Sequence, residues 1–223
     1  MTYPSLEQLT AQLNSDSTKD RVLAMVELQK GTIPAAEAFP LIKQAIDDRN
    51  VQVRGMAVFS LGIQQTPANF ALLSRILETD DDYNVRAMAA GALGYLEDKR
   101  ALEPLRRAFY EDTSWLVQFS AAIALGNLKD IQAQAVLLEA LDSDQGLLQQ
   151  GAVMALGEIG AVDTVDRLLA FADADDWLLR QRLAEALGKL PCDQSRSALK
   201  FLAKDAHPQV AEAARLALAN LDG

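Results

Sequence analysis

Residues 112–126, Asp-Thr-Ser-Trp-Leu-Val-Gln-Phe-Ser-Ala-Ala-Ile-Ala-Leu-Gly, form a sequence frame that recurs along nearly the whole chain. Gln118 lies near its centre, and the equivalent positions follow one another at intervals of 31 to 33 residues. Leucine stands seven residues after each of these positions, and glycine or alanine comes next in all but the first copy. A fixed period of this length indicates an array of repeated structural units. The equivalent positions, called anchors here, are Arg21, Arg54, Arg86, Gln118, Gln149, Arg180 and Ala211.

Each repeat contains two segments with helical periodicity, and no strand-like alternation separates them. We therefore expect an all-α fold, a right-handed α-solenoid (superhelix) of seven two-helix repeats that forms one domain over residues 1–223. Pro40 and Pro104 predict a bend or a late start in the first helix of their repeats. The expected repeats are approximately 1–30, 31–63, 64–96, 97–128, 129–159, 160–190 and 191–223. The fourteen expected helices are 5–13, 18–29, 35–48, 51–62, 69–78, 83–95, 101–110, 115–128, 133–141, 146–159, 162–171, 177–190, 195–203 and 208–221.

The chain is acidic, with 31 Asp and Glu against 21 Lys and Arg and a formal net charge of −10. Binding to nucleic acid depends on basic residues that neutralise phosphates, so we expect no nucleic-acid partner. No apolar run approaches the roughly 18 residues of a membrane span, and no secretory signal is visible. These features predict a soluble, cytoplasmic protein without a membrane span.

The turn between the two helices of each repeat contains one to three acidic residues, such as Asp80, Asp81 and Asp82. We expect them mainly to cap the second helix, where free amides and the helix dipole favour a carboxylate. The alternative is an acidic edge that attracts a basic partner. The arginine anchors are expected to form a ladder of ion pairs with the Asp of an adjacent turn. Gln118 and Gln149 interrupt this ladder, which suggests a functional region there.

The second helix of each repeat leaves one face without a structural explanation. Counting from the anchor, positions −1, +3, +6 and +7 point in one direction and are small or apolar, whereas −3, +1, +4 and +5 point the other way. We expect the latter face to form a concave aromatic groove, in which small residues such as Gly91 leave room for a pocket. The alternative is that these side chains only pack against neighbouring second helices. The candidate binding residues are Phe59, Tyr83, Met88, Trp115, Gln118, Phe119, Ile123, Met154 and Trp177.

The sequence gives little support for catalysis. Cys192 and His207 are the only cysteine and the only histidine, they fall in adjacent turns, and a functional nucleophile pair is the less favoured reading. No motif predicts a metal site or a nucleotide site. The single cysteine excludes an internal disulfide.

Residues 82–94 read Asp-Tyr-Asn-Val-Arg-Ala-Met-Ala-Ala-Gly-Ala-Leu-Gly, and this pattern resembles the HEAT-like repeats of the phycobilisome lyase type. The resemblance covers all seven repeats. It is similar to the pattern in cyanobacterial bilin lyase subunits, in the phycobilisome degradation protein NblB and in HEAT-repeat proteins implicated in iron–sulfur cluster handling. Deoxyhypusine hydroxylases and HEAT-like DNA glycosylases are disfavoured, because His-Glu pairs and a basic face are absent from the sequence.

The resemblance implies a cyanobacterial interaction scaffold that acts on phycobiliproteins or phycobilisomes through the groove. The implied partner is a phycobiliprotein subunit or a second HEAT-repeat subunit. One alternative is an enzyme, a bilin lyase that attaches or detaches an open-chain tetrapyrrole, with phycocyanobilin bound transiently. A further alternative is an assembly or iron–sulfur accessory protein, although one cysteine fits a cluster poorly unless chains associate.

Overall fold

The computed structural model describes residues 4–64 and 66–222. Within these ranges the chain consists of fourteen α-helices, four short 3-10 helices and connecting turns, with no β-strand. The expected all-α fold is thereby confirmed. Two compact units are present, residues 1–96 and 97–223, called unit 1 and unit 2 here. The handedness of the superhelix, the repeat count and the single-domain organisation stay predictions.

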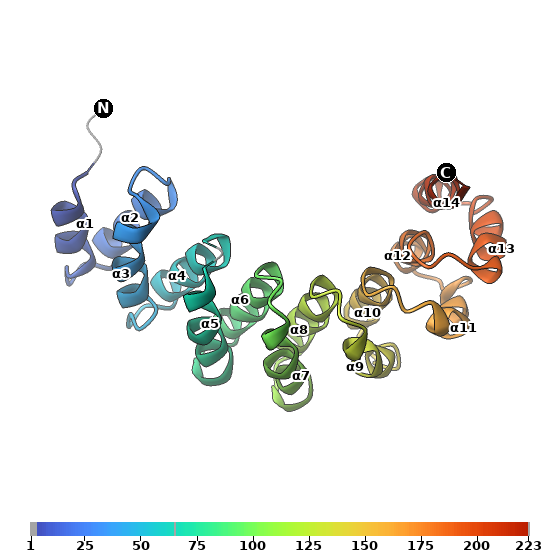
Figure 1. Ribbon diagram of the computed structural model, residues 1–223, viewed down its shortest axis with the longest axis horizontal. Helices are drawn as coiled ribbons and strands as arrows, with labels where there is room; N and C mark the ends of the chain where they lie inside the picture. Colours follow the sequence, from blue (N-terminus) through green and yellow to red (C-terminus); the bar gives the residue numbers. More distant parts are fainter. Residues whose placement is uncertain (1–3, 65, 223) are drawn as a thin grey trace. The chain divides into compact units, whose positions relative to one another are not determined.

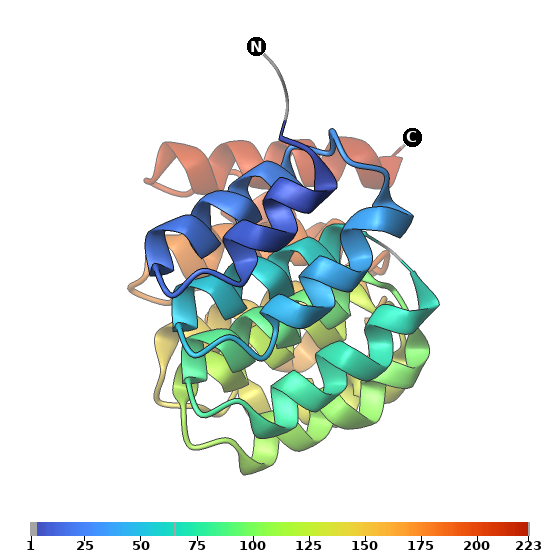
Figure 2. The same ribbon diagram turned by 90° about the vertical axis from the view of Figure 1, so that its left-hand side faces the viewer.

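Unit 1 contains three pairs of helices. The members of each pair pack against each other, and the second helices also form a row in which α4 contacts both α2 and α6. Figure 1 shows this row beside the first helices, and in Figure 2 the helices of unit 1, coloured blue to green, run side by side. The helices are α1 (Leu6–Leu13), α2 (Thr18–Gln29), α3 (Ala35–Ala45), α4 (Val51–Ile63), α5 (Pro67–Thr79) and α6 (Tyr83–Tyr95).

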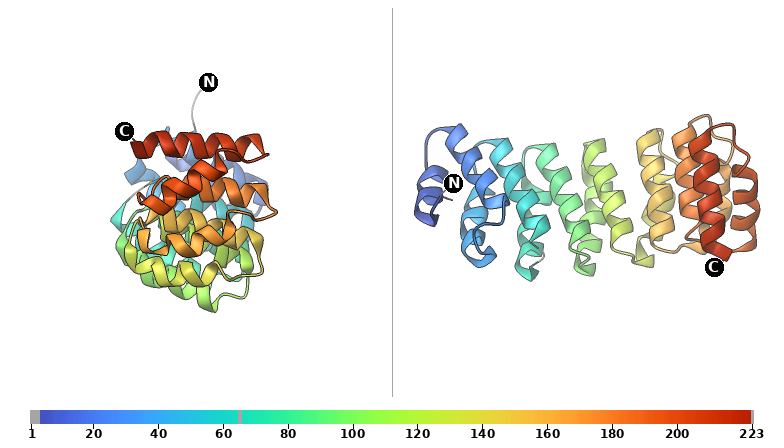
Figure 3. Two further views of the ribbon diagram at one scale, coloured as in Figure 1. Left: turned by 90° about the vertical axis from the view of Figure 1, so that its right-hand side faces the viewer. Right: turned by 90° about the horizontal axis from the view of Figure 1, so that it is seen from above.

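Unit 2 repeats the same arrangement, with α10 packed between α8 and α12, and α12 in contact with α14. Figure 3 shows α12 and α14, in orange and red, lying side by side. The 3-10 helices are η1 (Lys99–Ala101), η2 (Ile131–Ala133), η3 (Val162–Thr164) and η4 (Leu169–Phe171). The α-helices are α7 (Leu102–Glu111), α8 (Trp115–Asn127), α9 (Gln134–Ala140), α10 (Gly146–Glu158), α11 (Val165–Leu168), α12 (Trp177–Leu187), α13 (Asp193–Leu202) and α14 (Pro208–Asp222).

The expected helix boundaries agree with the structure to within three residues, with one exception. The predicted helix 162–171 is wrong as a continuous element, because only α11 is α-helical and η3 and η4 flank it. Val162, Thr164 and Val165 are β-branched, and such residues lower helix propensity. The proline prediction is confirmed at Pro104, which lies in the first turn of α7 after η1, so that helix starts late. Pro40 lies inside α3.

The recurring leucine and glycine of the frame have separate structural roles. The leucine seven residues after the anchor is buried in α2, α4, α6, α8, α10 and α12, where it forms the core. The glycine that follows lets the next second helix approach closely. A Cβ on Gly126 would lie only 2.7 Å from the Cα of Ala155, and one on Gly157 only 2.8 Å from the Cα of Ala186. Real Cβ contacts are longer, so glycine is required for this helix spacing.

The arginine anchors form the expected ion-pair ladder within each unit. Arg54 donates from Nε and Nη2 to both carboxylate oxygens of Asp80, at 2.8 and 2.9 Å. Its Nη1 donates to the carbonyl oxygen of Asp48 at 3.0 Å, six residues earlier in its own turn. The carboxylate hydrogen bond to Asp80 and its negative charge raise the pKa of Arg54 despite burial. The same bidentate geometry recurs in the pairs Arg21–Asp48 and Arg180–Asp205.

Five of the turn carboxylates fall into two structural groups. Asp82 and Asp176 cap their helices as expected, since their side chains accept amides from the first turn of the helix. Asp48, Asp80 and Asp205 instead accept the amide two residues later and bind the arginine of the preceding repeat. Such an Asx-type bond shapes the turn. Capping therefore explains only some of these residues.

Candidate functional site

The exposed face of the second helices differs from the predicted face at more than one position. Position +1 was expected to point outward, but in α4 and α6 it carries Gly55 and Ala87, which are buried. Position +4 was expected to point outward, but it is buried in the six helices from α2 to α12, where it carries Met25, Val58, Ala90, Ala122, Val153 and Ala184. That expectation is wrong, because position +4 lies only about 60° around the helix from the buried leucine at +7 and so falls on the buried face. In unit 1 the exposed residues instead follow positions +2, +5 and +9, a spacing of three and four residues that keeps them on one helix face. They include Leu23, Val26, Phe59, Ile63, Met88 and Tyr95.

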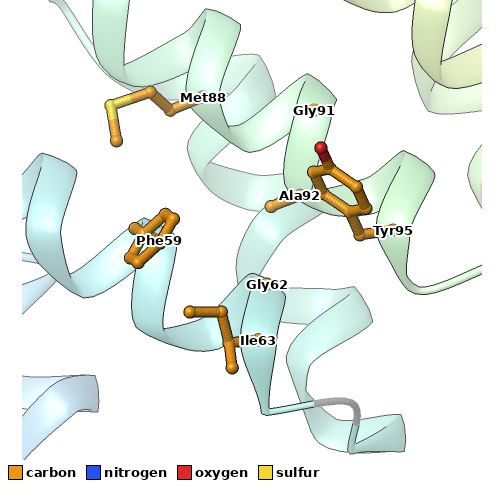
Figure 4. Close-up of a pocket in the computed structure, with 7 residues that line it drawn as sticks. All are labelled: Phe59, Gly62, Ile63, Met88, Gly91, Ala92 and Tyr95. Atoms are coloured by element: carbon orange, nitrogen blue, oxygen red, sulfur yellow. The ribbon is translucent and has the colours of Figure 1, made fainter. Parts of the chain in front are cut away.

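An open apolar pocket of about 440 Å³ lies between α4 and α6 in unit 1. Figure 4 shows four large side chains around it, with Phe59 and Ile63 on α4 and Met88 and Tyr95 on α6. Phe59 is 53% exposed and Ile63 is 63% exposed, so large apolar surfaces meet solvent here. The small residues Gly62, Gly91 and Ala92 line the space between them.

The sequence prediction included Phe59 and Met88 but missed Ile63 and Tyr95. Both lie nine residues after their anchor, one helical turn beyond the position of Phe59 and Gly91. Extending the stripe at +5 by one turn would have found them. Exposed large apolar groups that gather around a cavity are typical of a binding surface.

In unit 2 the predicted groove residues are packed more closely. A Cβ on Gly151 of α10 would lie 3.2 Å from Cδ1 of Ile123 and 3.2 Å from Cε2 of Phe119. These two side chains therefore cover the glycine, and both are only half-exposed. Met154 is half-exposed as well. Packing between neighbouring second helices, the alternative considered from the sequence, thus accounts for part of this stripe.

Trp115, Tyr83 and Trp177 stand at the amino ends of α8, α6 and α12, and all three are exposed. The ring of Trp177 stacks on His207 with a centroid distance of 4.1 Å and an interplanar angle of 12°. Part of its surface is therefore occupied by a contact within unit 2. Trp115, which is 47% exposed, presents the larger free aromatic surface of the two.

Gln118 has a hydrogen bond that matches the arginine anchors. Its Nε2 donates to the carbonyl oxygen of Asp112 at 3.0 Å, again six residues earlier. Gln149 donates to the carbonyl oxygen of Leu141 at 3.2 Å. Both glutamines therefore support the turn before their own helix. This bond gives Gln118 a structural role, and a role in binding stays a prediction.

Where the ion-pair ladder is interrupted, both the arginine and its partner carboxylate are replaced by uncharged residues. In the sequence, the carboxylate position of the next turn is Asp48, Asp80, Asp112 or Asp205 after an arginine anchor, but Ser143 after Gln118 and Ala174 after Gln149. An arginine without its carboxylate would be an uncompensated, partly buried charge. The paired replacement avoids that penalty.

The outward face of α4 and α6 is uncharged, whereas the turns that precede these two helices are acidic. In α4 and α6 the only charged residues are Arg54 and Arg86, and both reach toward the turns. Burial raises the pKa of Asp82, but hydrogen bonds from the amides of Asn84 and Val85 outweigh this effect and hold the pKa below its usual value. The Asp82 carboxylate thus stays ionised at neutral pH at the amino end of α6.

Cys192 and His207, the nucleophile pair considered from the sequence, each contact another partner. Sγ of Cys192 lies 3.2 Å from Oγ of Ser195 at the start of α13, and His207 stacks on Trp177. Among the described residues there is no group of three or more His, Cys, Asp or Glu side chains that could hold a metal ion. No helix within the described ranges is long and apolar enough to cross a membrane. The arrangement is suited to binding through apolar contact.

HEAT repeats match residues 6–83, 70–150 and 146–219. Together these ranges cover nearly all of the chain, so the protein belongs to the HEAT-repeat family. A comparison with curated protein sequences gives no match.

Three solved structures illustrate how widely this fold is used. A chain from the complex of CpcE and CpcF of phycocyanin lyase from Nostoc sp. PCC7120 is 20% identical, with a TM-score of 0.65, over 99% of this chain and 96% of that chain. The E. coli protein YibA is 16% identical, with a TM-score of 0.61, over 98% of this chain and 93% of that chain. A chain from the structure of Kap95p with RanGDP is 16% identical, with a TM-score of 0.63, over 97% of this chain and 35% of that chain. At these identities the likeness concerns the fold.

Proposed function

We propose that this protein is an interaction scaffold that holds a phycobiliprotein subunit on the uncharged face of its second helices. The observation that carries the proposal is the exposed apolar surface of α4 and α6, which surrounds an open pocket with Phe59, Ile63, Met88 and Tyr95. Exposed apolar side chains that gather around an open pocket are typical of a binding surface. The fold shared with a chain of the CpcE and CpcF complex supports the choice of partner.

Binding to purified phycocyanin tests this proposal directly. The chain is immobilised, and phycocyanin is supplied as the intact protein and as the separated α subunit, with and without chromophore. We expect saturable binding that Phe59→Ala or Met88→Ala weakens at least about tenfold, as for central residues of an interface. Phe201→Ala is the matched control, because this side chain is equally exposed but lies on the first helix α13. Absence of binding by the wild-type chain would remove the proposed partner.

A second candidate function is a bilin lyase that attaches or detaches an open-chain tetrapyrrole such as phycocyanobilin. The pocket volume favours it, since about 440 Å³ falls within the roughly 300–1,000 Å³ of small-molecule sites. The apolar lining suits pyrrole rings, but none of the described lining residues supplies a cation for the propionate groups. Residues outside the pocket would have to bind those groups.

The lyase candidate is tested by following visible absorbance while the purified chain is incubated with phycocyanobilin and apo-phycocyanin. Attachment faster than in buffer, with the adduct retained after denaturation, would support catalysis. Binding of phycocyanin with an unchanged rate of attachment would instead support a scaffold or an assembly factor. An iron–sulfur role would require chains to associate, because each contributes only Cys192, and anaerobic reconstitution followed by absorbance would test it.

A further inference from the structure

Position 91 is the exception in the outward stripe of the second helices. Five residues after the anchor, every other repeat carries a side chain of at least valine size, whereas α6 carries glycine. The other residues at this position are Val26, Phe59, Ile123, Met154, Glu185 and Leu216.

Neither helix packing nor backbone conformation explains Gly91. A Cβ at this position would meet no atom within 4 Å, whereas one on Gly62, Gly126 or Gly157 would press against the next helix. Gly91 also lies within the continuous helix α6 and is not among the glycines with positive φ, which are Gly31 and Gly160. Glycine in a helix interior lowers stability relative to alanine. The chain therefore keeps the space above Gly91 open although this weakens the helix.

The space above Gly91 has apolar walls and the shape of a groove between two helices. Phe59 and Ile63 form one wall at a spacing of four residues on α4, and Met88 and Tyr95 form the other on α6 (Figure 4). None of the described residues that line it is charged. A helix laid into such a groove inserts bulky side chains at a spacing of three or four residues. The lining thus favours an apolar group over a charged ligand.

The amino ends of α4 and α6 add a charge preference. Asp48 and Asp80 are bound by Arg21 and Arg54 and are largely buried. The neighbouring Asp47 and Asp81 are exposed in the same turns. Asp47 also accepts a hydrogen bond from Arg75 at 3.0 Å, but this pair lies at the surface, where an ion pair is weak and both groups stay accessible. Eight residues separate Tyr83 from Gly91, or about 12 Å along the helix axis. A partner helix that fills the pocket can therefore bring basic residues to this acidic edge.

We propose that the pocket above Gly91 receives a bulky apolar side chain from an amphipathic α-helix of a partner protein, and that Lys or Arg residues of this helix face Asp47 and Asp81. The inference rests on the proposed function in one respect, that the partner is a protein. It adds that the pocket above Gly91 anchors the partner, and that the partner contains an amphipathic helix with a bulky apolar residue and Lys or Arg residues.

The test uses the full chain and a displayed library of helical peptides with randomised apolar and basic positions. Gly91→Leu fills the pocket, and Gly146→Leu is the matched control, because Gly146 also has no atom within 4 Å of an added Cβ but lies on α10. We expect enriched peptides with large apolar residues three or four apart and flanking Lys or Arg. They should bind Gly91→Leu at least tenfold more weakly than wild type, and Gly146→Leu unchanged. Thermal unfolding of Gly91→Leu at or above the wild-type midpoint shows that the loss is not unfolding.

The acidic edge is tested with the same peptides. Asp47→Asn combined with Asp81→Asn should weaken binding by several-fold at low salt and less at high salt. Peptides that bind this double variant as tightly as wild type would overturn the charge assignment.

Three outcomes would overturn the pocket assignment. The first is the absence of any peptide that distinguishes wild type from Gly91→Leu. The second is a wild-type dimer in sedimentation that Gly91→Leu converts to monomer, which makes the occupant a second copy. The third is a small apolar molecule retained by wild type and lost from Gly91→Leu in native mass spectrometry.

The two proposals fail separately. If the wild-type chain binds the selected helices but not phycocyanin, phycocyanin is rejected as the partner and the pocket assignment stands. If phycocyanin binds wild type and Gly91→Leu equally strongly, the proposed partner is supported, but the pocket is not part of the interface with it.

Discussion

Gly91 and Gly126 both lie inside second helices, but a methyl group added at the two positions meets different surroundings. Gly91→Ala enters open space, so we expect unfolding free energy to rise by about 0.5–1 kcal/mol through helix propensity alone. Gly126→Ala would place Cβ 2.7 Å from the backbone of Ala155. Such overpacking is expected to destabilise the chain by about 1–3 kcal/mol. Urea denaturation followed by circular dichroism measures both, and a destabilised Gly91→Ala would show that glycine is needed for the fold.

Asp205 gives a prediction about pH. The hydrogen bonds from Arg180 hold the pKa of Asp205 below its usual value of 3.8. A carboxylate with a lowered folded-state pKa stabilises the fold fully above about pH 5 and loses that contribution as the pH falls through 4 and below. Asp205→Asn should therefore lower the thermal midpoint at pH 7, and its difference from wild type should shrink toward pH 3. Asp144→Asn, at an exposed turn position, is the control. A difference that is constant with pH would contradict this role.

In unit 2 the ion-pair ladder that links one helix pair to the next is interrupted at Gln118 and Gln149. In Arg180–Asp205 the pair is bidentate and largely buried, and 25 residues separate its members. The same separation joins Gln118 to Ser143, where neither side chain is charged. The sequence predicted a functional meaning for the glutamines, whereas the paired replacement explains them structurally.

Restoring the missing pair tests this explanation. Gln118→Arg alone should destabilise the chain, because the guanidinium would lack a carboxylate, and Ser143→Asp alone should give little gain. The double variant should recover this loss, with a coupling energy of about 1–2 kcal/mol in a double-mutant cycle. Urea denaturation of the four proteins provides the measurement. Purely additive effects would show that the two positions do not meet.

The helices were predictable because leucine recurs at a fixed position in every copy, and alanine and glycine recur at theirs in most copies. α6 begins and ends where the pattern placed it, at Tyr83 and Tyr95. The broken α11 was not predictable, because its apolar spacing resembles that of its neighbours and only local propensity differs. The sequence argument also missed the burial of position +4, although this position lies only about 60° around the helix from the buried leucine at +7.

The net charge of the whole chain predicts that nucleic acid is not a partner. With a net charge of −10, the chain should show no saturable binding to a labelled DNA duplex in fluorescence anisotropy, even at low salt. Tight binding that weakens with salt would contradict the assignment of the acidic surface to basic proteins.

The sequence by itself determined the repeat frame, the all-α fold, the ion-pair ladder and the presence of apolar residues on the outward stripe. These follow from local spacing, which one sequence displays directly. Only the tertiary structure decided where that stripe is open. Phe119 and Ile123 cover Gly151, whereas a Cβ on Gly91 would meet no atom within 4 Å, and the residues adjacent to each glycine in the sequence do not reveal this difference. The sequence placed the centre of the site near Trp115, whereas the pocket lies between α4 and α6. Its position could not be predicted from one helix, because side chains of both helices form the cavity.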